Sequence, residues 1–202
     1  MNDVKGFTLV EMLVSMAIFS VITAFAVANF RAGQQGDELR ISTQLVASTI
    51  RHAQTLAMAG QTLHYCHGGS TEGRLCPSGE DAECSGGSCI RDLPLGYGVR
   101  LSTDVTGRRV AIVFADTDGN HALDAGEELR RDSVSSGPFV QVSALDPHVA
   151  GTLDIVFIPP KPLVKYNGAE TDTVATITLE HRQTGRTRQV TINRISGQVN
   201  AD

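Results

Sequence analysis

The stretch Gly6-Phe7-Thr8-Leu9-Val10-Glu11 opens an apolar run that continues to Phe30. The 24 residues from Phe7 to Phe30 make about 36 Å of α-helix at about 1.5 Å per residue, which is long enough to cross a lipid bilayer with some tilt. A polar leader, Met1 to Gly6, precedes the run. An ordinary signal peptide has a shorter apolar core and a cleavage site that follows it. Because the leader comes first here, a cut after Gly6 leaves the apolar segment on the mature protein.

Glu11 is the one ionisable side chain between Phe7 and Phe30. A carboxylate inside a membrane span costs roughly 2.5–3.5 kcal/mol, so Glu11 needs a partner. One interpretation is an acid at the start of a helix, stabilised by the helix dipole. The other is an ion pair with the α-amine of a neighbouring copy, since a cut after Gly6 creates that amine at Phe7, four residues before Glu11.

These residues resemble the processing motif of type IV pilins and of the pseudopilins of type II secretion systems, over about the first 30 residues. The resemblance implies that a prepilin peptidase cuts after Gly6, that the new terminal Phe7 is N-methylated, and that Glu11 docks the subunit during assembly. It implies a single-pass protein of the bacterial inner membrane with its head in the periplasm, incorporated into a filament after processing. The implied partners are other pilins or pseudopilins and an inner-membrane assembly platform. An ordinary signal anchor is the alternative, but its cut and span come in the opposite order.

The second half of the helix, residues 31–60, is expected to be amphipathic. Its apolar residues recur at spacings of three, four and seven, which is typical of a helix face that packs on a sheet: Leu39, Val46, Ile50, Ala53 and Ala57. Gly60 is expected to cap this helix. The predicted organisation is therefore a leader (1–6), a membrane-spanning half-helix (7–30), an amphipathic half-helix (31–60) and a head (61–202).

Short alternating segments after Gln61 predict antiparallel β-strands. In order, they are residues 62–66, 97–101, 109–115, 128–134, 139–144, 152–158, 173–180 and 187–194. The strand at 109–115 is expected in the interior of a sheet. Pro159, Pro160 and Pro162 are expected to interrupt regular structure. The predicted fold class is α+β, with one long amino-terminal helix packed on an antiparallel β-rich head.

The order of the later segments narrows the resemblance. Val-Phe-Ala-Asp-Thr-Asp-Gly-Asn (113–120) is followed by Glu-Glu-Leu-Arg (127–130), Ile-Val-Phe-Ile-Pro (155–159) and a last hairpin that leads to Ile-Ser-Gly-Gln-Val (195–199). This order is similar to the GspH/FimT branch of the pilin-like family. The branch contains minor pseudopilins of type II secretion systems and minor pilins of type IV pili. The resemblance implies the first role, with the second as the alternative, and a pilin-like fold.

Four cysteines lie within 24 residues rich in Gly and Ser: Cys66, Cys76, Cys84 and Cys89. An even number of clustered cysteines in a polar loop predicts disulfides in an oxidising compartment. The alternative is a zinc site that includes His64 or His67. Zinc ligands usually come as tight C-x2-C pairs, whereas here nine, seven and four residues separate the cysteines. Four cysteines allow three connectivities, and the spacing does not choose among them.

The stretch Asp116 to Glu127 has the ligand spacing of an EF-hand-type calcium loop. The oxygen ligands at loop positions 1, 3, 5, 7, 9 and 12 are Asp116, Asp118, Asn120, the carbonyl of Ala122, Asp124 and Glu127. Two features depart from the pattern, since His121 occupies the usual glycine position and the flanks are predicted strands. The alternative is a polar turn that binds no metal. A Ca²⁺ ion in this loop is expected to be structural.

Gly185-Arg186-Thr187-Arg188 matches a Gly-Arg-x-Arg motif with which some minor pilins of the GspH/FimT branch bind DNA. In those relatives the motif lies at the terminal Ser-Gly-Gln-Val, which here contains no arginine. The literal match in this chain implies that Arg186 and Arg188 would contact the phosphates of DNA. A solvated basic turn is the alternative. The net charge of −5 argues against a generally basic nucleic-acid-binding protein.

The sequence lacks the motifs of common enzyme classes. Its six histidines show no His-Glu-x-x-His spacing, and the serines show no Gly-x-Ser-x-Gly elbow. It also has no Gly-rich phosphate-binding loop. We therefore expect a structural subunit without catalytic residues.

Overall fold

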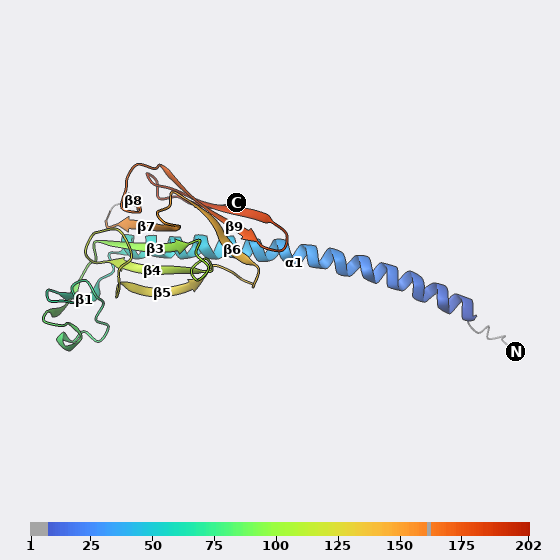
Figure 1. The fold of residues 1–202 in the computed structure, drawn as a ribbon, viewed down its shortest axis with the longest axis horizontal. Helices are drawn as coiled ribbons and strands as arrows, with labels where there is room; N and C mark the ends of the chain where they lie inside the picture. Colours follow the sequence, from blue (N-terminus) through green and yellow to red (C-terminus); the bar gives the residue numbers. More distant parts are fainter. Residues whose placement is uncertain (1–7, 161–162) are drawn as a thin grey trace. The chain divides into compact units, whose positions relative to one another are not determined.

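The computed structural model describes residues 8–160 and 163–202, apart from the side chains of residues 28, 31 and 32. Within those residues, one long helix, α1 (Leu9–Ala59), is followed by a series of short strands (Figure 1). The chain divides between Asp37 and Glu38 into two compact units. The first contains the amino-terminal part of α1, and the second, here called the head, comprises Glu38–Asp202.

The part of α1 that belongs to the head supplies one wall of the core. Its predicted stripe is confirmed, because all five of its members are buried: Leu39, Val46, Ile50, Ala53 and Ala57. The helix ends at Ala59, and Gly60 follows with a φ of +61°, a left-handed conformation that glycine adopts without a steric penalty. These residues, which fall in the half-helix expected at 31–60, contribute to the main hydrophobic core.

Eleven strands follow within the described residues, and a single 3-10 turn, η1 (Asp81–Glu83), lies between the first two. The strands are β1 (Leu63–His67), β2 (Ser88–Asp92), β3 (Gly96–Ser102), β4 (Val110–Asp116), β5 (Glu128–Ser133), β6 (Val140–Asp146), β7 (Thr152–Ile158), β8 (Leu163–Tyr166), β9 (Val174–His181), β10 (Arg186–Asn193) and β11 (Val199–Ala201).

All strand pairs are antiparallel. A five-stranded sheet has the order β5-β4-β3-β7-β8, a four-stranded sheet has the order β11-β10-β9-β6, and β1 pairs with β2 alone. The interior position predicted for the strand at 109–115 is confirmed, since β4 pairs with both β3 and β5.

One hydrophobic core joins the helix to both larger sheets. It includes Ile50 of α1, Val99 of β3, Ile155 of β7 and Ile177 of β9. Two buried tyrosines connect elements across it. The Tyr97 hydroxyl donates to the Gln61 carbonyl at 2.5 Å, and the Tyr166 hydroxyl donates to the Ile192 carbonyl at 2.7 Å. The buried members of this core all lie between residues 39 and 199, so the head carries the core that it needs to fold as a fragment.

The eight predicted strands are confirmed within one or two residues at most boundaries, and β7 matches the prediction at both ends. Three strands were not predicted. β8 begins at Leu163, soon after the prolines that were expected to interrupt regular structure, and β11 has only three residues. β2 lies in the polar cysteine-containing stretch, where pairing with β1 rather than an alternating pattern defines the strand.

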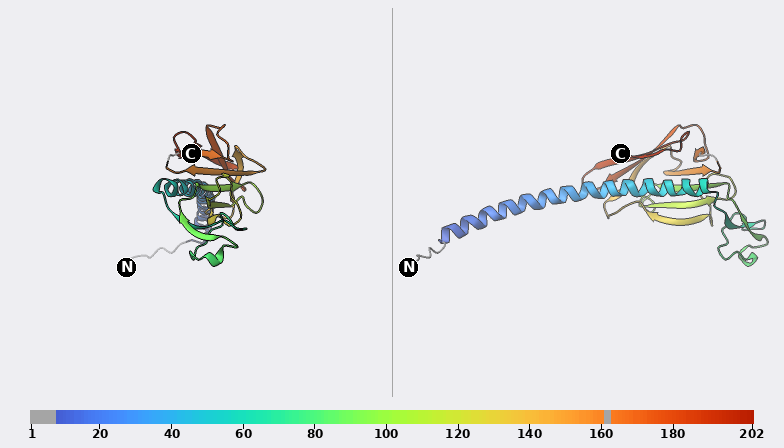
Figure 2. Two further views of the ribbon diagram at one scale, coloured as in Figure 1. Left: turned by 90° about the vertical axis from the view of Figure 1, so that its left-hand side faces the viewer. Right: turned by 180° about the vertical axis from the view of Figure 1, so that it is seen from behind.

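Two ends of the head can be distinguished along α1 (Figures 1 and 2). The Cys loop, defined as residues 63–92 from β1 to β2, lies at the end where α1 finishes, and the β9–β10 hairpin turn lies at the opposite end. Contacts with Glu38 locate that opposite end. The Nε2 atom of His181, the last residue of β9, lies 3.6 Å from a Glu38 carboxylate oxygen.

Candidate functional site

The predicted cleavage site, Gly6 and Phe7, lies outside the described residues. The helix start beside it is described, and Thr8 and Glu11 form a capping box there. The Thr8 backbone N–H and hydroxyl donate to Glu11 Oε2 at 3.1 and 3.0 Å, and the Glu11 N–H donates to Thr8 Oγ1 at 3.3 Å. In the single chain, Glu11 thus caps its own helix.

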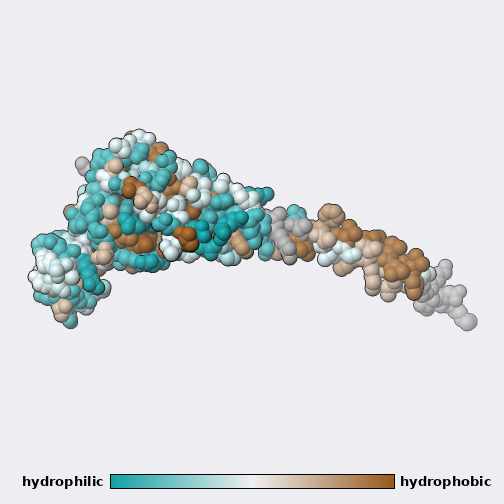
Figure 3. Space-filling view, viewed as in Figure 1, coloured by the Kyte–Doolittle hydropathy of each residue, from teal (hydrophilic) through white to brown (hydrophobic). Residues whose placement is uncertain are grey.

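The apolar segment Leu9–Val27 is long and apolar enough to cross a membrane, although a signal sequence near the N-terminus has the same properties. Its side chains are exposed rather than packed on other described residues. Apolar residues therefore dominate this part of the surface, whereas the surface of the Cys loop is largely polar (Figure 3). At about 1.5 Å per residue, the 19 residues span about 28 Å, close to the thickness of the hydrocarbon layer.

The hydroxyl groups in this segment bond to the helix itself. Ser15 donates to the Glu11 carbonyl at 2.6 Å, Ser20 to the Met16 carbonyl at 2.8 Å and Thr23 to the Phe19 carbonyl at 2.8 Å. Polar groups in a bilayer must find partners inside the protein, because lipid tails offer none. These local bonds make the hydroxyl groups compatible with a nonpolar environment.

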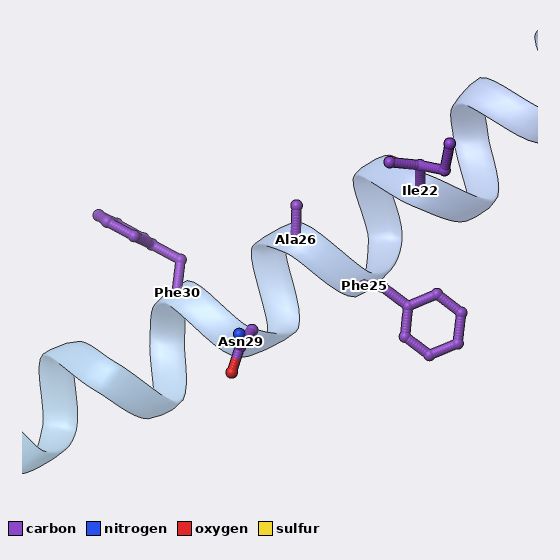
Figure 4. A pocket seen from close by; sticks show the side chains of 5 residues that line it. All are labelled: Ile22, Phe25, Ala26, Asn29 and Phe30. Atoms are coloured by element: carbon purple, nitrogen blue, oxygen red, sulfur yellow. The ribbon is translucent and has the colours of Figure 1, made fainter.

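The segment carries apolar side chains on several faces. Figure 4 shows Ile22, Ala26 and Phe30 projecting from one side of α1, with Phe25 on another. The hollow that they line is formed by one helix alone and is open to solvent, so it is not a ligand pocket. A helix that is apolar all round is stable only when lipid or other helices cover it.

The cysteines are paired as Cys66–Cys84 and Cys76–Cys89, which resolves the three connectivities left open by the sequence. Because no cysteine is free, the thiolates that a zinc site needs are absent. The His64 side chain lies beside Gly79, and His67 Nδ1 lies 3.9 Å from a carboxylate oxygen of Glu72.

The Asp116–Glu127 stretch forms a compact loop between β4 and β5, here called the Asp loop. Oxygen atoms of Asp116, Asp118 and Glu127 lie within 4.8 Å of one another. His121, at the position where glycine is usual, has a φ of +62°, which is the left-handed conformation that glycine would supply. Its Nδ1 atom lies 2.8 Å from Asp116 Oδ2.

The remaining predicted ligands also bond within the Asp loop. The Asn120 side-chain amide contacts the carboxylates of Asp118 and Asp124, and the Ala122 N–H donates to Asn120 Oδ1 at 2.7 Å. Burial raises the pKa of Glu127, while hydrogen bonds from the backbone N–H groups of Thr117 and Asp124 oppose that rise. The loop therefore gathers carboxylates that are already hydrogen-bonded.

The sequence did not predict that the Cys loop packs on the Asp loop. The Thr117 hydroxyl donates to the Gly73 carbonyl at 2.7 Å, and the Leu75 N–H donates to the Gly126 carbonyl at 3.0 Å. Backbone carbonyls carry no sequence signal, so only the tertiary structure reveals these contacts. The two disulfides thus lie within a loop that contacts the Asp loop at Thr117 and Gly126.

Arg186 and Arg188 both lie at the start of β10 and are exposed. Successive residues of a strand point to opposite faces, so the two arginines share one face of the hairpin. They lie at the end of the head that is opposite to the Asp loop, and the structure does not bring these two predicted sites together.

Comparison with known proteins identifies one family model, the prokaryotic N-terminal methylation motif, which matches residues 1–27. No curated protein and no solved structure matches the chain. The match covers the predicted cleavage site, Glu11 and the apolar segment. Proteins with this motif are processed by a prepilin peptidase, held in the inner membrane and assembled with other pilins, typically as non-enzymatic subunits. The chain therefore carries a prokaryotic N-terminal methylation motif at the start of a long helix, which packs through its second half on antiparallel sheets.

Proposed function

We propose that this protein is a minor pseudopilin of a type II secretion system, cut after Gly6, N-methylated at Phe7 and assembled into a short periplasmic filament. The methylation motif carries the proposal, because it leads directly into the exposed apolar segment. The order of head elements, which resembles the GspH/FimT branch, supports the choice of machine. The disulfide-bonded Cys loop suits a specialised position in the filament better than a repeated one.

Glu11 has a free acceptor for the assembly step in this proposal. Both Thr8 bonds go to Oε2, so among the described residues Oε1 accepts no hydrogen bond. The α-amine of a processed neighbour can bond to that oxygen while the capping box stays intact. An ion pair in the low dielectric of the membrane is much stronger than one in water, which favours docking between subunits.

Processing and assembly are tested separately. In a host with an active prepilin peptidase, the mature mass should lack Met1 to Gly6 and carry one methyl group. Glu11→Ala is expected to be cut normally but to be missing from sheared filaments, whereas the matched variant Ser15→Ala should assemble. An unprocessed wild-type mass would refute the proposal.

Deletion of the gene tests whether the subunit serves a secretion system or a pilus. Loss of secreted enzymes from the medium, with pili unchanged, is the expected result. Loss of pili with normal secretion would instead identify a minor pilin of a type IV pilus. Subunit counting in purified filaments tests the minor role, because a major subunit would dominate the preparation.

A minor pilin that binds DNA for uptake is the second candidate, and the exposed side chains of Arg186 and Arg188 favour it. Two arginines can bind DNA phosphates without contacting base edges, so the affinity for duplex DNA would fall as the salt concentration rises. Loss of that binding in Arg186→Ala/Arg188→Ala would support this candidate, and no binding at low salt would exclude it.

We also propose that the Asp loop holds a structural Ca²⁺ ion. The cluster of Asp116, Asp118 and Glu127 and the left-handed His121 fit a loop that wraps one cation. Asn120, the carbonyl of Ala122 and Asp124 complete the oxygen ligands in this proposal. The Asn120 amide now donates to carboxylates, so it must turn its oxygen inward to act as a ligand. A bound cation would offset the repulsion among these carboxylates.

A further inference from the structure

Three arginines form an exposed basic cluster at the turn between β9 and β10. Arg182, Arg186 and Arg188 belong to a run, residues 182–189, in which every residue is exposed. Across residues 8–160 and 163–202, none of the three forms an ion pair with a carboxylate. Four other arginines do, including Arg130 with Asp132 and Arg131 with Glu128 on β5. The cluster therefore keeps its full charge for a partner outside the head.

This cluster lies at the end of the head where α1 enters. Arg186 is the cross-strand partner of His181, whose imidazole lies 3.6 Å from the Glu38 carboxylate. The Arg182 N–H donates to the Phe139 carbonyl at 2.9 Å, and the Phe139 N–H donates to Glu38 Oε1 at 3.4 Å. Arg186 and Arg182 thus each pair with a residue that contacts Glu38, the first residue of the head, and Arg188 follows two positions after Arg186 on β10.

The length of the chain between the head and the membrane segment is short. Val27, which ends the apolar segment, and Glu38 are eleven residues apart. Even a fully extended chain of that length reaches no more than about 40 Å. While the apolar segment is in the bilayer, this length limits how far Glu38 can move from the membrane, and lipid headgroups are within its reach.

Exposed apolar side chains lie in two loops that are linked to β6, the strand that pairs with β9. Val105 is 79% exposed and Val149 is 61% exposed, and their loops are joined by a bond from the Thr103 N–H to the Gly151 carbonyl at 2.9 Å. The Val142 N–H donates to the Arg108 carbonyl at 2.9 Å, which links these loops to the start of β6 beside the hairpin. Arginine with scattered apolar side chains is typical of surfaces that contact lipid headgroups.

We propose that the Glu38 end of the head binds anionic phospholipid headgroups through Arg182, Arg186 and Arg188, in the membrane that holds the subunit before assembly. The partner is the lipid surface itself. A basic residue near an anionic membrane raises binding several-fold, and three together raise it on the order of 100-fold. Extraction of the subunit into a filament must then break this contact. The inference requires insertion of the apolar segment but does not depend on which machine the subunit serves.

The test uses the head fragment, residues 38–202, with sedimenting vesicles. Vesicles of equal parts phosphatidylcholine and phosphatidylglycerol should bind the fragment, and vesicles of phosphatidylcholine alone should not. Binding should weaken as salt rises. Arg186→Ala/Arg188→Ala should lose roughly 30-fold in affinity for the anionic vesicles, while Arg186→Lys/Arg188→Lys retains most of it, because the contact depends on charge.

Arg130→Ala/Arg131→Ala is the matched control, since it removes the same charge from arginines that already pair with carboxylates. It should bind vesicles like the wild type. Equal binding by both alanine variants, or no preference for anionic vesicles, would overturn the proposal. Binding of duplex DNA without binding of vesicles, lost in Arg186→Ala/Arg188→Ala, would overturn it in favour of a nucleic-acid contact.

A second measurement uses the full chain in nanodiscs and does not require any variant to fold. Amide exchange in residues 182–189 should slow in anionic nanodiscs compared with phosphatidylcholine nanodiscs, and exchange in the Cys loop should not change. Equal exchange of residues 182–189 in both lipids would contradict the proposal. Neither readout involves cleavage or methylation, so its failure is distinguishable from failure of the proposed function.

Discussion

Residues 9–27 and residues 39–57 are both helical, yet only the second stretch buries a stripe of apolar side chains within this chain. In the second stretch most of the apolar residues share one face, so the sheets of the head can cover them. In the first they occur on several faces, which a single head cannot cover. The comparison shows that periodicity, more than total hydrophobicity, decides whether a helix folds against its own chain or requires an external partner.

A matched pair of charged substitutions gives the largest expected contrast. Ile50 is 0% exposed, so Ile50→Asp should place an unpaired charge in the core and cost more than about 4 kcal/mol, enough to unfold the head. Ile22→Asp should leave the head intact and cost about 3 kcal/mol of membrane insertion. Thermal unfolding in detergent and membrane fractionation measure the two effects. A lower melting temperature of the head in Ile22→Asp would show that the two regions are not energetically separate.

The disulfides allow the stability of the Cys loop to be compared with that of the main core of the head. Cys76–Cys89 closes a sequence separation of 13, and its removal in Cys76→Ser/Cys89→Ser should cost about 3 kcal/mol. Because the buried cysteines form a cluster apart from the main core, the loss should be largely local. Hydrogen exchange should increase in residues 63–92 and remain slow around Ile50. Ser88→Ala is the exposed control, and faster exchange throughout α1 would contradict a separate cluster.

Alkaline pH should lower the folding stability of the head alone, because the segment from Leu9 to Val27 contains no tyrosine that could ionise. Burial raises the pKa of Tyr97 and of Tyr166 to about 12. In the unfolded chain both ionise near pH 10, so their contribution to stability is complete below pH 10 and is lost as pH rises from about 10 to 12. Each should contribute about 2–3 kcal/mol to that loss.

Urea unfolding at several pH values measures this dependence. Tyr97→Phe should reduce the alkaline loss but not remove it, because burial also raises the pKa of Tyr166 and of Tyr65. At neutral pH the same variant should cost about 1 kcal/mol, since the Gln61 carbonyl loses its donor. An unchanged alkaline slope in Tyr97→Phe would show that this hydroxyl ionises normally in the folded head.

Calcium should give the smallest effect, confined to the head. At a tenfold excess over Kd, Ca²⁺ should stabilise the head by about 1.4 kcal/mol and raise its melting temperature by about 3–6 °C. Chelation should reverse the shift. Asp118→Asn/Asp124→Asn should abolish it, and Asp104→Asn, a change at an exposed aspartate outside the Asp loop, should not. A shift that persists in the double variant would assign the calcium to another site.

Much of the fold could be predicted because its signals are local. Helix periodicity identified the buried stripe from Leu39 to Ala57, and alternation located eight strands. β2, β8 and β11 were missed for a common reason. Each has five residues or fewer and pairs with one neighbouring strand. That pairing stabilises the strand, whereas its own sequence shows no clear alternation of apolar and polar residues. Sheet order was also beyond the sequence, because strand partners depend on contacts between distant residues.

The candidate sites also divide into those with local sequence signals and those that depend on tertiary contacts. The sequence by itself identified the processing motif, Glu11 and the apolar segment. Both recognition by a peptidase and insertion into a bilayer depend on a continuous stretch of chain. Only the tertiary structure decided the cysteine pairing, the packing of the Cys loop on the Asp loop, and the pairing of Arg186 with His181, which lies against Glu38. Those features depend on which residues meet across sheets and loops, and spacing along the chain does not encode that.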